Sequence, residues 1–169
     1  QTTAQTIFKE WFGKYQFDDD LPEDWQALQL RDLSTKISKG TTPRKKDIEG
    51  LAPKIPFLKV KDLSDDGLIK KDNLELIPNE VHLKQLKRSI LKTNDILFSI
   101  AGTIGRVSIV DKELENSNCN QALAFIRLKD KKRYLSLIYF WLKFQSTQNE
   151  IKSSIVQGVQ ANVSLTVLK

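Results

Sequence analysis

The chain has 169 residues and a hydrophobic fraction of 40%, enough for one domain of ordinary size with its own core. It contains one cysteine, Cys119, one histidine, His82, and no methionine. These counts exclude an internal disulfide framework, fit a reducing cytoplasm, and argue against a histidine-based metal site or catalytic triad. No apolar run approaches ~18 residues, so the sequence predicts no transmembrane helix.

The net charge of +6 is unevenly distributed along the chain. Residues 1–32 contain 3 basic and 7 acidic side chains, whereas residues 33–169 contain 24 basic and 14 acidic ones. A basic body behind an acidic segment indicates a polyanionic partner, although a lysine-rich proteome would give the same excess. The first residues lack the pattern of a secretion signal, and the missing methionine favours a fragment of a longer chain.

The first predicted element is a helix at residues 6–15, where apolar side chains recur at helical spacing. Its stripe contains Ile7, Phe8, Trp11, Phe12 and Tyr15. The stripe fits the end of a longer helix, and it also fits a short helix that covers the domain's own core. An acidic linker with Pro22 follows at residues 18–24, and alternation predicts a half-buried strand at residues 25–30.

The next part of the chain alternates between turns and strands. A turn from Gly40 to Pro43 is expected, and three consecutive cations follow it. A strand is predicted at residues 57–63, and a turn at residues 65–67. Alternation along this strand places three side chains on one face: Phe57, Lys59 and Lys61.

Two strands, at residues 95–100 and 106–110, are predicted on either side of the turn Gly102-Thr103-Ile104-Gly105. A phosphate-binding loop would open a helix, but the residues after Gly105 favour a strand. The turn is therefore expected to join two strands, with glycines that let another backbone approach closely. A third strand at residues 120–128 has apolar residues on both faces, as an inner strand does.

Two helices are predicted near the end of the chain. Residues 134–144 are apolar nearly all round, which is typical of a buried helix. The residues from Thr147 to Glu150 have the spacing of a capping box, so a second helix should run to about Val156 and end before Gly158. Strands interspersed with helices predict a mixed α/β (α+β) domain.

The carboxylates, Cys119 and His82 give little support for catalysis or metal binding. Asp62, Asp65 and Asp66 gather at a turn, without the spacing of a calcium loop. A structural role is the more common one for a lone cysteine such as Cys119. His82 is expected to be a loop side chain.

The basic side chains are more informative, because lysine and arginine neutralise phosphates while amides and arginine read base edges. Each lysine on its own is more commonly a solvated surface charge. The basic groups are Arg44, Lys45 and Lys46; Lys59 and Lys61; Lys87 and Arg88; and Lys129, Lys131, Lys132 and Arg133. The candidate amides are Asn120, Gln121, Gln157, Gln160 and Asn162.

An ordered set of motifs over residues 21–169 resembles the target recognition domain of a type I restriction-modification specificity subunit. The motifs are Trp25 with Leu30-Arg31-Asp32-Leu33, Gly40-Thr41-Thr42-Pro43, Ile55-Pro56-Phe57-Leu58-Lys59-Val60-Lys61-Asp62-Leu63, Asp95-Ile96-Leu97-Phe98-Ser99-Ile100-Ala101-Gly102-Thr103-Ile104-Gly105, Asn118-Cys119-Asn120-Gln121-Ala122, and Gly158 with Gln160-Ala161-Asn162-Val163-Ser164. The resemblance implies a twisted, mostly antiparallel β-sheet with packed helices. It divides the chain into the end of a spacer helix (1–17), the acidic linker (18–24) and the recognition domain (25–169).

The same resemblance implies a function without catalysis. Such a domain reads one half of a bipartite DNA target, and the methyltransferase, which binds S-adenosylmethionine, and the restriction nuclease are separate subunits. The preceding helix implies the second domain of a specificity subunit, or a fusion to a methyltransferase, and it should contact the methyltransferase subunit. The shared motifs should determine the fold, which applies to Asn120 and Gln121 and to Gly40, Pro43, Gly102, Gly105 and Gly158.

The predicted DNA contacts follow from charge and position, with Arg106 as the leading candidate. They are Arg44, Lys45, Lys46, Lys59, Lys61, Lys87, Arg88, Ser99, Thr103 and Arg106. Two other interpretations remain open. One is a metal-dependent nuclease or transferase that uses Asp62, Asp65 and Asp66. The other is a protein-interaction module without DNA binding, which docks its partner through Trp11, Phe12 and the apolar helix at residues 134–144.

Overall fold

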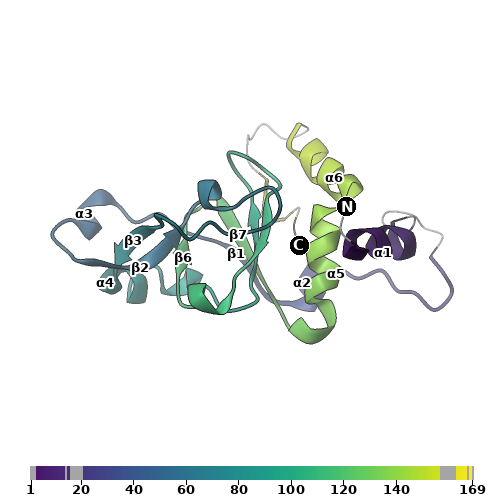
Figure 1. Cartoon of the computed structure of the whole chain (residues 1–169), viewed down its shortest axis with the longest axis horizontal. Helices are drawn as coiled ribbons and strands as arrows, with labels where there is room; N and C mark the ends of the chain where they lie inside the picture. The colour runs from purple at the N-terminus through teal and green to yellow at the C-terminus, as the bar shows by residue number, and fades with distance from the viewer. Residues whose placement is uncertain (1–2, 14, 16–20, 157–162, 167, 169) are drawn as a thin grey trace.

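Two β-sheets follow one another along the long axis of the molecule, and helices lie at both ends (Figure 1). The computed structural model describes residues 3–13, 15, 21–156, 163–166 and 168. Within these residues, no helix is long and apolar enough to cross a membrane. Strands and helices alternate along the chain, which confirms the predicted mixed α/β class.

The larger sheet has the strand order β1-β7-β4-β5, and all its neighbours are antiparallel. Its strands are β1 (Ser34–Lys39), β7 (Leu123–Leu128), β4 (Ile96–Ser99) and β5 (Val107–Ile109). The predicted hairpin around the glycine turn is confirmed as β4 and β5. The third strand lies inside the sheet as expected, but it begins at Leu123 because residues 121 and 122 form a turn.

Each face of the larger sheet is covered by its own core. On one face, Ile96, Phe98 and Ile126 pack with α5 (Lys131–Lys143) and α6 (Gln145–Val156). On the other face, Leu97 and Phe125 pack against residues that lead toward the second sheet. The alternation of side chains along each strand places neighbouring residues in different cores. Burial on both faces explains why these strands are continuous apolar runs.

The smaller sheet has the order β3-β2-β6 and contains one parallel pair, β2 with β6. Its strands are β2 (Pro53–Leu58), β3 (Glu75–Pro78) and β6 (Asn118–Cys119). A third core cluster, which includes Phe57 and Ile77, packs this sheet against α4 (Asn79–Leu83). The one-turn helix α3 (Lys45–Ile48) lies beyond it, at the end of the molecule opposite α1 (Figure 1).

The N-terminal helix α1 (Thr3–Phe12) begins and ends about three residues earlier than predicted. The apolar side chains of this helix lie in two different environments. Phe8 is buried, with its ring centroid 5.6 Å from that of Phe144. Ile7 and Trp11 are instead 47% and 64% exposed. The helix therefore covers part of the domain's own core with one side and presents apolar side chains to solvent with the other.

Two predicted strands are corrected by the structure. Residues 25–29 are irregular and lead into the short helix α2 (Leu30–Leu33). The ring of Trp25 packs against Phe12 at 5.5 Å and Tyr15 at 5.1 Å, so its partner is α1 and not a sheet. The strand expected at residues 57–63 ends at Leu58. The 3-10 helix η1 (Val60–Asp62) follows because the Asp62 carboxylate accepts a hydrogen bond from the Lys59 backbone N–H at 2.7 Å.

The two C-terminal helices exist as predicted, but with different details. The helix α5 begins at Lys131, where the Asp130 side chain accepts from the Arg133 N–H at 3.0 Å. It is amphipathic, and only Ile138 and Leu142 are fully buried. The helix α6 begins at Gln145, so the expected capping box at residues 147–150 lies inside the helix and is wrong. The predicted loop residues Gln157, Gly158, Gln160 and Asn162 lie outside the described residues.

Candidate nucleic-acid interface

Two stretches of the chain carry basic charge and no acid. Residues 33–46 contain five lysine or arginine residues, and residues 81–94 contain four. The first stretch includes β1 and leads to α3, and the second runs from α4 through the 3-10 helix η2 (Lys87–Ser89). Eight of these cations are exposed, and we call them the basic surface: Lys39, Arg44, Lys45, Lys46, Lys84, Lys87, Arg88 and Lys92.

Three contacts bring the two stretches together. The Lys36 ammonium donates a hydrogen bond to the carbonyl oxygen of Arg88 at 2.5 Å. The Gln85 amide donates to the carboxylate of Asp47, directly after the first stretch, at 3.1 Å. Arg44 and Lys84 line the same open hollow of about 460 Å³ between α3 and α4. Segments 38 to 52 residues apart in the sequence thus form one positively charged region.

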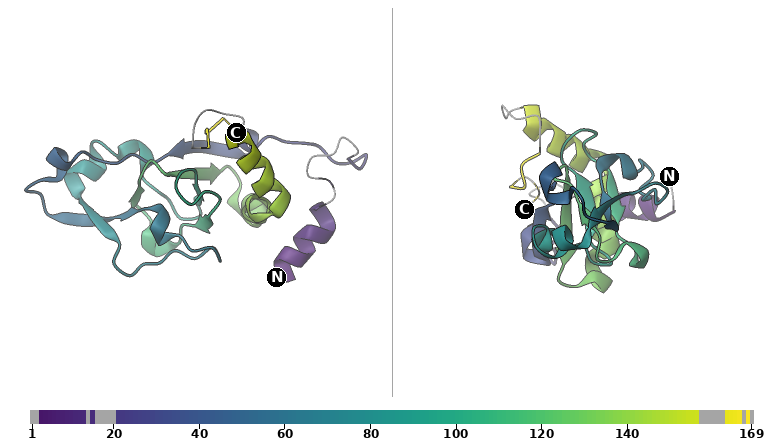
Figure 2. Two further views of the ribbon diagram at one scale, coloured as in Figure 1. Left: turned by 90° about the horizontal axis from the view of Figure 1, so that it is seen from above. Right: turned by 90° about the vertical axis from the view of Figure 1, so that its left-hand side faces the viewer.

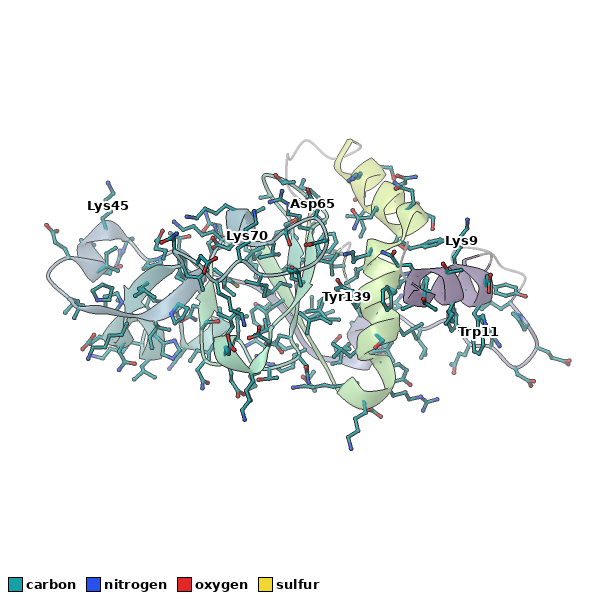
Figure 3. All side chains as sticks on the ribbon, viewed as in Figure 1. Lys9, Trp11, Lys45, Asp65, Lys70 and Tyr139 are labelled. Atoms are coloured by element: carbon teal, nitrogen blue, oxygen red, sulfur yellow. The ribbon has the colours of Figure 1, made fainter. Side chains whose placement is uncertain are left out.

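The α3 end of this region has one internal ion pair. Arg44 pairs with Asp47 at 2.9 Å, and this hydrogen bond holds the pKa of the Asp47 carboxyl below its usual range. Among the described residues, Lys45 and Lys46 form no ion pair, and the Lys45 side chain points away from the body of the protein (Figure 3). Cations in such positions keep their charge available for a polyanion.

The turn from Gly40 is fixed against the loop before β7. The backbone N–H groups of Gly40 and Thr41 donate to the carbonyl oxygens of Leu123 and Cys119 at 3.0 and 3.1 Å. The Thr42 hydroxyl donates to the side-chain oxygen of Gln121. The Asn120 side-chain oxygen accepts from the N–H of Ala122 at 3.2 Å. Both amides that the sequence assigns to the fold thus make hydrogen bonds within it.

The glycine turn between β4 and β5 has two residues with positive φ, Gly102 at 71° and Gly105 at 97°. Ser99 is fully buried beneath it. Its hydroxyl donates to the Thr103 carbonyl at 2.6 Å and accepts from the Arg106 N–H at 2.8 Å. Ser99 therefore has no surface for a direct DNA contact, and its predicted role is corrected to that of a turn residue.

Arg106 lies beside η1 and away from α3. Its Nε donates to Asp65 at 2.8 Å, and its Nη1 donates to the Val60 carbonyl at 3.2 Å. Lys59 in the same region pairs with Glu75, whereas Lys61 is exposed. The predicted contacts thus form two groups. Arg44, Lys45, Lys46, Lys87 and Arg88 belong to the basic surface, and Lys59, Lys61, Thr103 and Arg106 lie around η1 and the glycine turn.

The three carboxylates considered for a metal site do not converge. Asp62 caps η1, Asp65 pairs with Arg106, and Asp66 accepts from Ser64 and from the Leu68 N–H. The hydrogen bond from Ser64 lowers the pKa of Asp66. In the part of the chain that the structure describes, no group of three or more possible metal-binding side chains exists. The geometry does not support the metal-dependent alternative.

Cys119 and His82 are both buried and have structural roles. Burial raises the pKa of the Cys119 thiol to about 12, as expected for a structural cysteine. The prediction that His82 is a loop side chain is wrong. His82 lies on α4 and is buried, with Nδ1 2.6 Å from the side-chain oxygen of Asn118. An apolar environment and a buried amide partner give it a structural role.

Residues 22–169 match the family model described as the type I restriction modification DNA specificity domain. The chain belongs to this family. The specificity domain is also similar to the EcoBI specificity subunit of Escherichia coli, with 30% identity over 152 residues that cover 88% of this chain and 31% of the relative. The chain therefore spans about a third of the length of the curated relatives it matches.

Solved structures of type I specificity subunits share the fold of this specificity domain. The HsdS subunit of Thermoanaerobacter tengcongensis aligns with a TM-score of 0.59 and 19% identity, over 96% of this chain and 39% of that one. A structure described in work on complex assembly and conformational transition of the type I R-M system aligns with a TM-score of 0.60 and 17% identity, over 98% and 37%. The fold that the sequence motifs implied is confirmed.

Three residues of the basic surface in the specificity domain were not among the predicted DNA contacts. Lys39, Lys84 and Lys92 stand apart from the basic doublets and triplets, so a search for clustered cations passes over them. The signal that identifies them is the absence of acids between Asp32 and Asp47 and between Glu80 and Asp95. The pairing of these two stretches depends on tertiary contacts such as Lys36 with Arg88.

Proposed function

We propose that this specificity domain recognises one half of a split DNA target on behalf of a type I restriction-modification enzyme. The observation that carries the proposal is the basic surface, formed by two acid-free stretches within a domain of this family. Exposed cations attract the phosphates of DNA, and the arginines among them suit base edges. This function also accounts for the separation of charge between residues 1–32 and the rest of the chain.

The domain is proposed to contribute recognition and no catalysis. Its carboxylates cap turns or pair with cations, and its cysteine is a buried neutral thiol. The methyl transfer, with S-adenosylmethionine as donor, and the DNA cleavage would then belong to partner subunits. The free, buried cysteine suits the reducing cytoplasm in which genomic DNA is found in bacteria.

The methyltransferase subunit is the proposed partner of α1. Ile7 and Trp11 lie four residues apart on the exposed side of this helix, and Trp11 points away from the domain (Figure 3). Exposed aromatic side chains of this kind are common at the centre of protein interfaces. We propose that residues 1–17 are the end of a spacer helix, that residues 18–24 are a linker, and that residues 25–169 are the second recognition domain of the parent subunit.

The residues proposed to contact DNA differ in the intramolecular ion pairs that they form. Lys45, Lys46, Lys87 and Arg88 have no ion pair among the described residues, whereas Arg44 shares its charge with Asp47. Lys61 and Thr103 are exposed, and Lys59 and Arg106 must exchange an intramolecular partner to bind DNA. We therefore propose the basic surface as the main contact and the group around Arg106 as a secondary one.

Deletion of the parent gene tests this function in the cell that carries it. Genomic methylation is mapped by sequencing before and after the deletion. The proposal expects a methylated split motif that disappears with the gene and returns when the gene is supplied on a plasmid. An unchanged methylation pattern would contradict it. Steep loss of binding with added salt, measured for the purified enzyme, would separate a DNA-binding role from a purely protein-binding one.

A further inference from the structure

The segment 84–93 is held to the fold through its backbone. Four of its carbonyl oxygens accept hydrogen bonds from side chains that lie elsewhere in the chain. The pairs are Leu86 with Asn118 at 3.2 Å, Arg88 with Lys36 at 2.5 Å, Ile90 with Arg127 at 3.0 Å, and Thr93 with Lys131 at 2.7 Å. Three of these four donors are cations, which make stronger hydrogen bonds than neutral donors.

A buried ion pair with Asp95 fixes Arg127, the side chain that donates to the Ile90 carbonyl oxygen. Both oxygens of Asp95 accept from the Arg127 guanidinium, at 2.9 and 2.6 Å, and Asp95 is fully buried. The same carboxylate accepts from the backbone N–H of Lys92 at 2.8 Å. The path of segment 84–93 is thus set by groups on both sheets and on α5, with the Asp95–Arg127 pair at its centre.

The segment contains both buried anchors and exposed side chains. Leu86, Ser89 and Leu91 are buried, and Leu86 and Leu91 belong to two different core clusters. Ile90 and Thr93 are partly buried, and five side chains are exposed: Lys84, Gln85, Lys87, Arg88 and Lys92. Neither Lys87 nor Arg88 forms an ion pair within the described part of the chain, although the Arg88 carbonyl is bound.

The contrast with α3 separates two roles within the basic surface. The one-turn helix α3 carries Lys45 and Lys46 at the far end of the molecule, where its Asp47 receives a hydrogen bond from Gln85. Segment 84–93 lies against the core and is anchored at several points along its backbone. Phosphate contacts tolerate positional freedom, whereas base reading requires a preorganised donor in a fixed position.

We propose that segment 84–93 is the specificity-determining element of this domain, with Arg88 as its leading base-reading side chain. The inference rests on the proposed DNA-recognition function. Arginine pairs with the O6 and N7 atoms of guanine, and the adjacent Lys87 adds a further donor. Because the backbone is held from outside the segment, its exposed side chains are exchangeable without a change of path. The domain thus carries a replaceable recognition surface on a fixed support.

A charge-matched pair of variants tests this role in the complete enzyme. The parent specificity subunit is produced in cells with its methyltransferase, and methylated sites are mapped by sequencing. The Lys87→Gln/Arg88→Gln variant is compared with Lys132→Gln/Arg133→Gln, which removes the same two residue types from the exposed start of α5. Melting temperatures of the purified subunits should stay close to the unchanged one, because all four side chains are exposed.

The first variant should relax or shift one half of the methylated motif. The preference for the original base pair should fall on the order of 10- to 100-fold, with the other half unchanged. The control variant should keep the whole motif. A motif that stays intact in Lys87→Gln/Arg88→Gln, with methylation reduced equally at all sites, would overturn the inference. Failure of the proposed function looks different, since the unchanged enzyme would then methylate no split motif.

If the first variant methylates no site, its DNA binding is measured directly. The purified complexes are bound to the original duplex and to duplexes with one base pair replaced at a time. A smaller ratio of affinities than in the unchanged enzyme supports base reading by the segment. An equal ratio with uniformly weaker binding would assign Lys87 and Arg88 to phosphate contacts and overturn the inference.

Discussion

Three buried polar residues hold turns of the backbone through side-chain oxygens. Asp62 accepts from the Lys59 N–H at 2.7 Å, Asp95 from the Lys92 N–H at 2.8 Å, and Ser99 from the Arg106 N–H at 2.8 Å. Buried polar groups of this kind persist because they are hydrogen bonded. The sequence presents Asp62 as possible chemistry and Ser99 as a possible contact, since it does not show that their partners are local backbone groups.

Gly40 and Gly102 are glycines for different reasons. A Cβ at Gly40 would collide with the carbonyl oxygens of Cys119 and Asn120, which belong to fixed backbone. Gly40→Ala should therefore lower the free energy of unfolding by about 3 kcal/mol or more, at the upper end for overpacking. Urea denaturation of the parent subunit or of the isolated chain measures this loss.

Gly102→Ala is the matched control, because nothing lies within 4 Å of a Cβ there and the cost comes from its φ of 71°. A left-handed conformation costs a non-glycine residue about 1–2 kcal/mol. Gly102→Ala should thus be the milder change. Equal losses in the two variants would contradict the close approach of backbone at Gly40.

The Cys119 thiol should resist labelling in the folded protein. Burial raises its pKa from 9.0 to about 12, so the reactive thiolate is almost absent at pH 8. Folding favours the neutral thiol, and its contribution to stability is complete below pH about 9 and declines as the pH rises toward 12. A disulfide reagent at pH 8 should react only as fast as the chain unfolds. Rapid reaction of native protein would show that the thiol is accessible.

At the scale of elements, the sequence correctly predicts the strands whose hydrophobic pattern matches their burial in the fold. The hairpin β4–β5 and the inner strand β7 were predictable because both faces are buried and their apolar runs are continuous. The strand expected at residues 25–30 fails because Trp25 packs on α1, which alternation alone does not reveal. The candidate interface was predicted as separate basic groups, and its assembly depends on long-range contacts such as Lys36 with Arg88.

The two sides of α1 should respond differently to truncation. Phe8 is 5% exposed and packs on Phe144, so Phe8→Ala should cost up to about 3–5 kcal/mol or detach the helix. Trp11 is 64% exposed, so Trp11→Ala should change stability by less than about 0.5 kcal/mol.

The same Trp11→Ala variant should weaken binding of the parent subunit to the methyltransferase, measured by calorimetry. Phe8→Ala serves as the comparison for stability. Full retention of methyltransferase affinity in Trp11→Ala would remove α1 from the proposed interface, whatever the effect on stability.

The whole molecule separates its proposed roles along its long axis. The helix with the exposed Trp11 lies at one end, and α3 and the smaller sheet lie at the other, as the view from above also shows (Figure 2, left). Among the described residues up to Asp32, four acids outnumber two cations, and the basic surface extends toward the second end. In the proposed function, the basic surface would attract the DNA phosphates and the acids near α1 would repel them, which would orient the domain on its target.

Exchange of the recognition domain tests the central claim most directly. Residues 22–169 of the parent subunit are replaced by the corresponding domain of another family member, and methylated sites are mapped by sequencing. The account predicts that one half of the split motif changes to that of the donor while the other half and the spacing persist. An active hybrid enzyme with an unchanged motif would contradict DNA recognition by this domain.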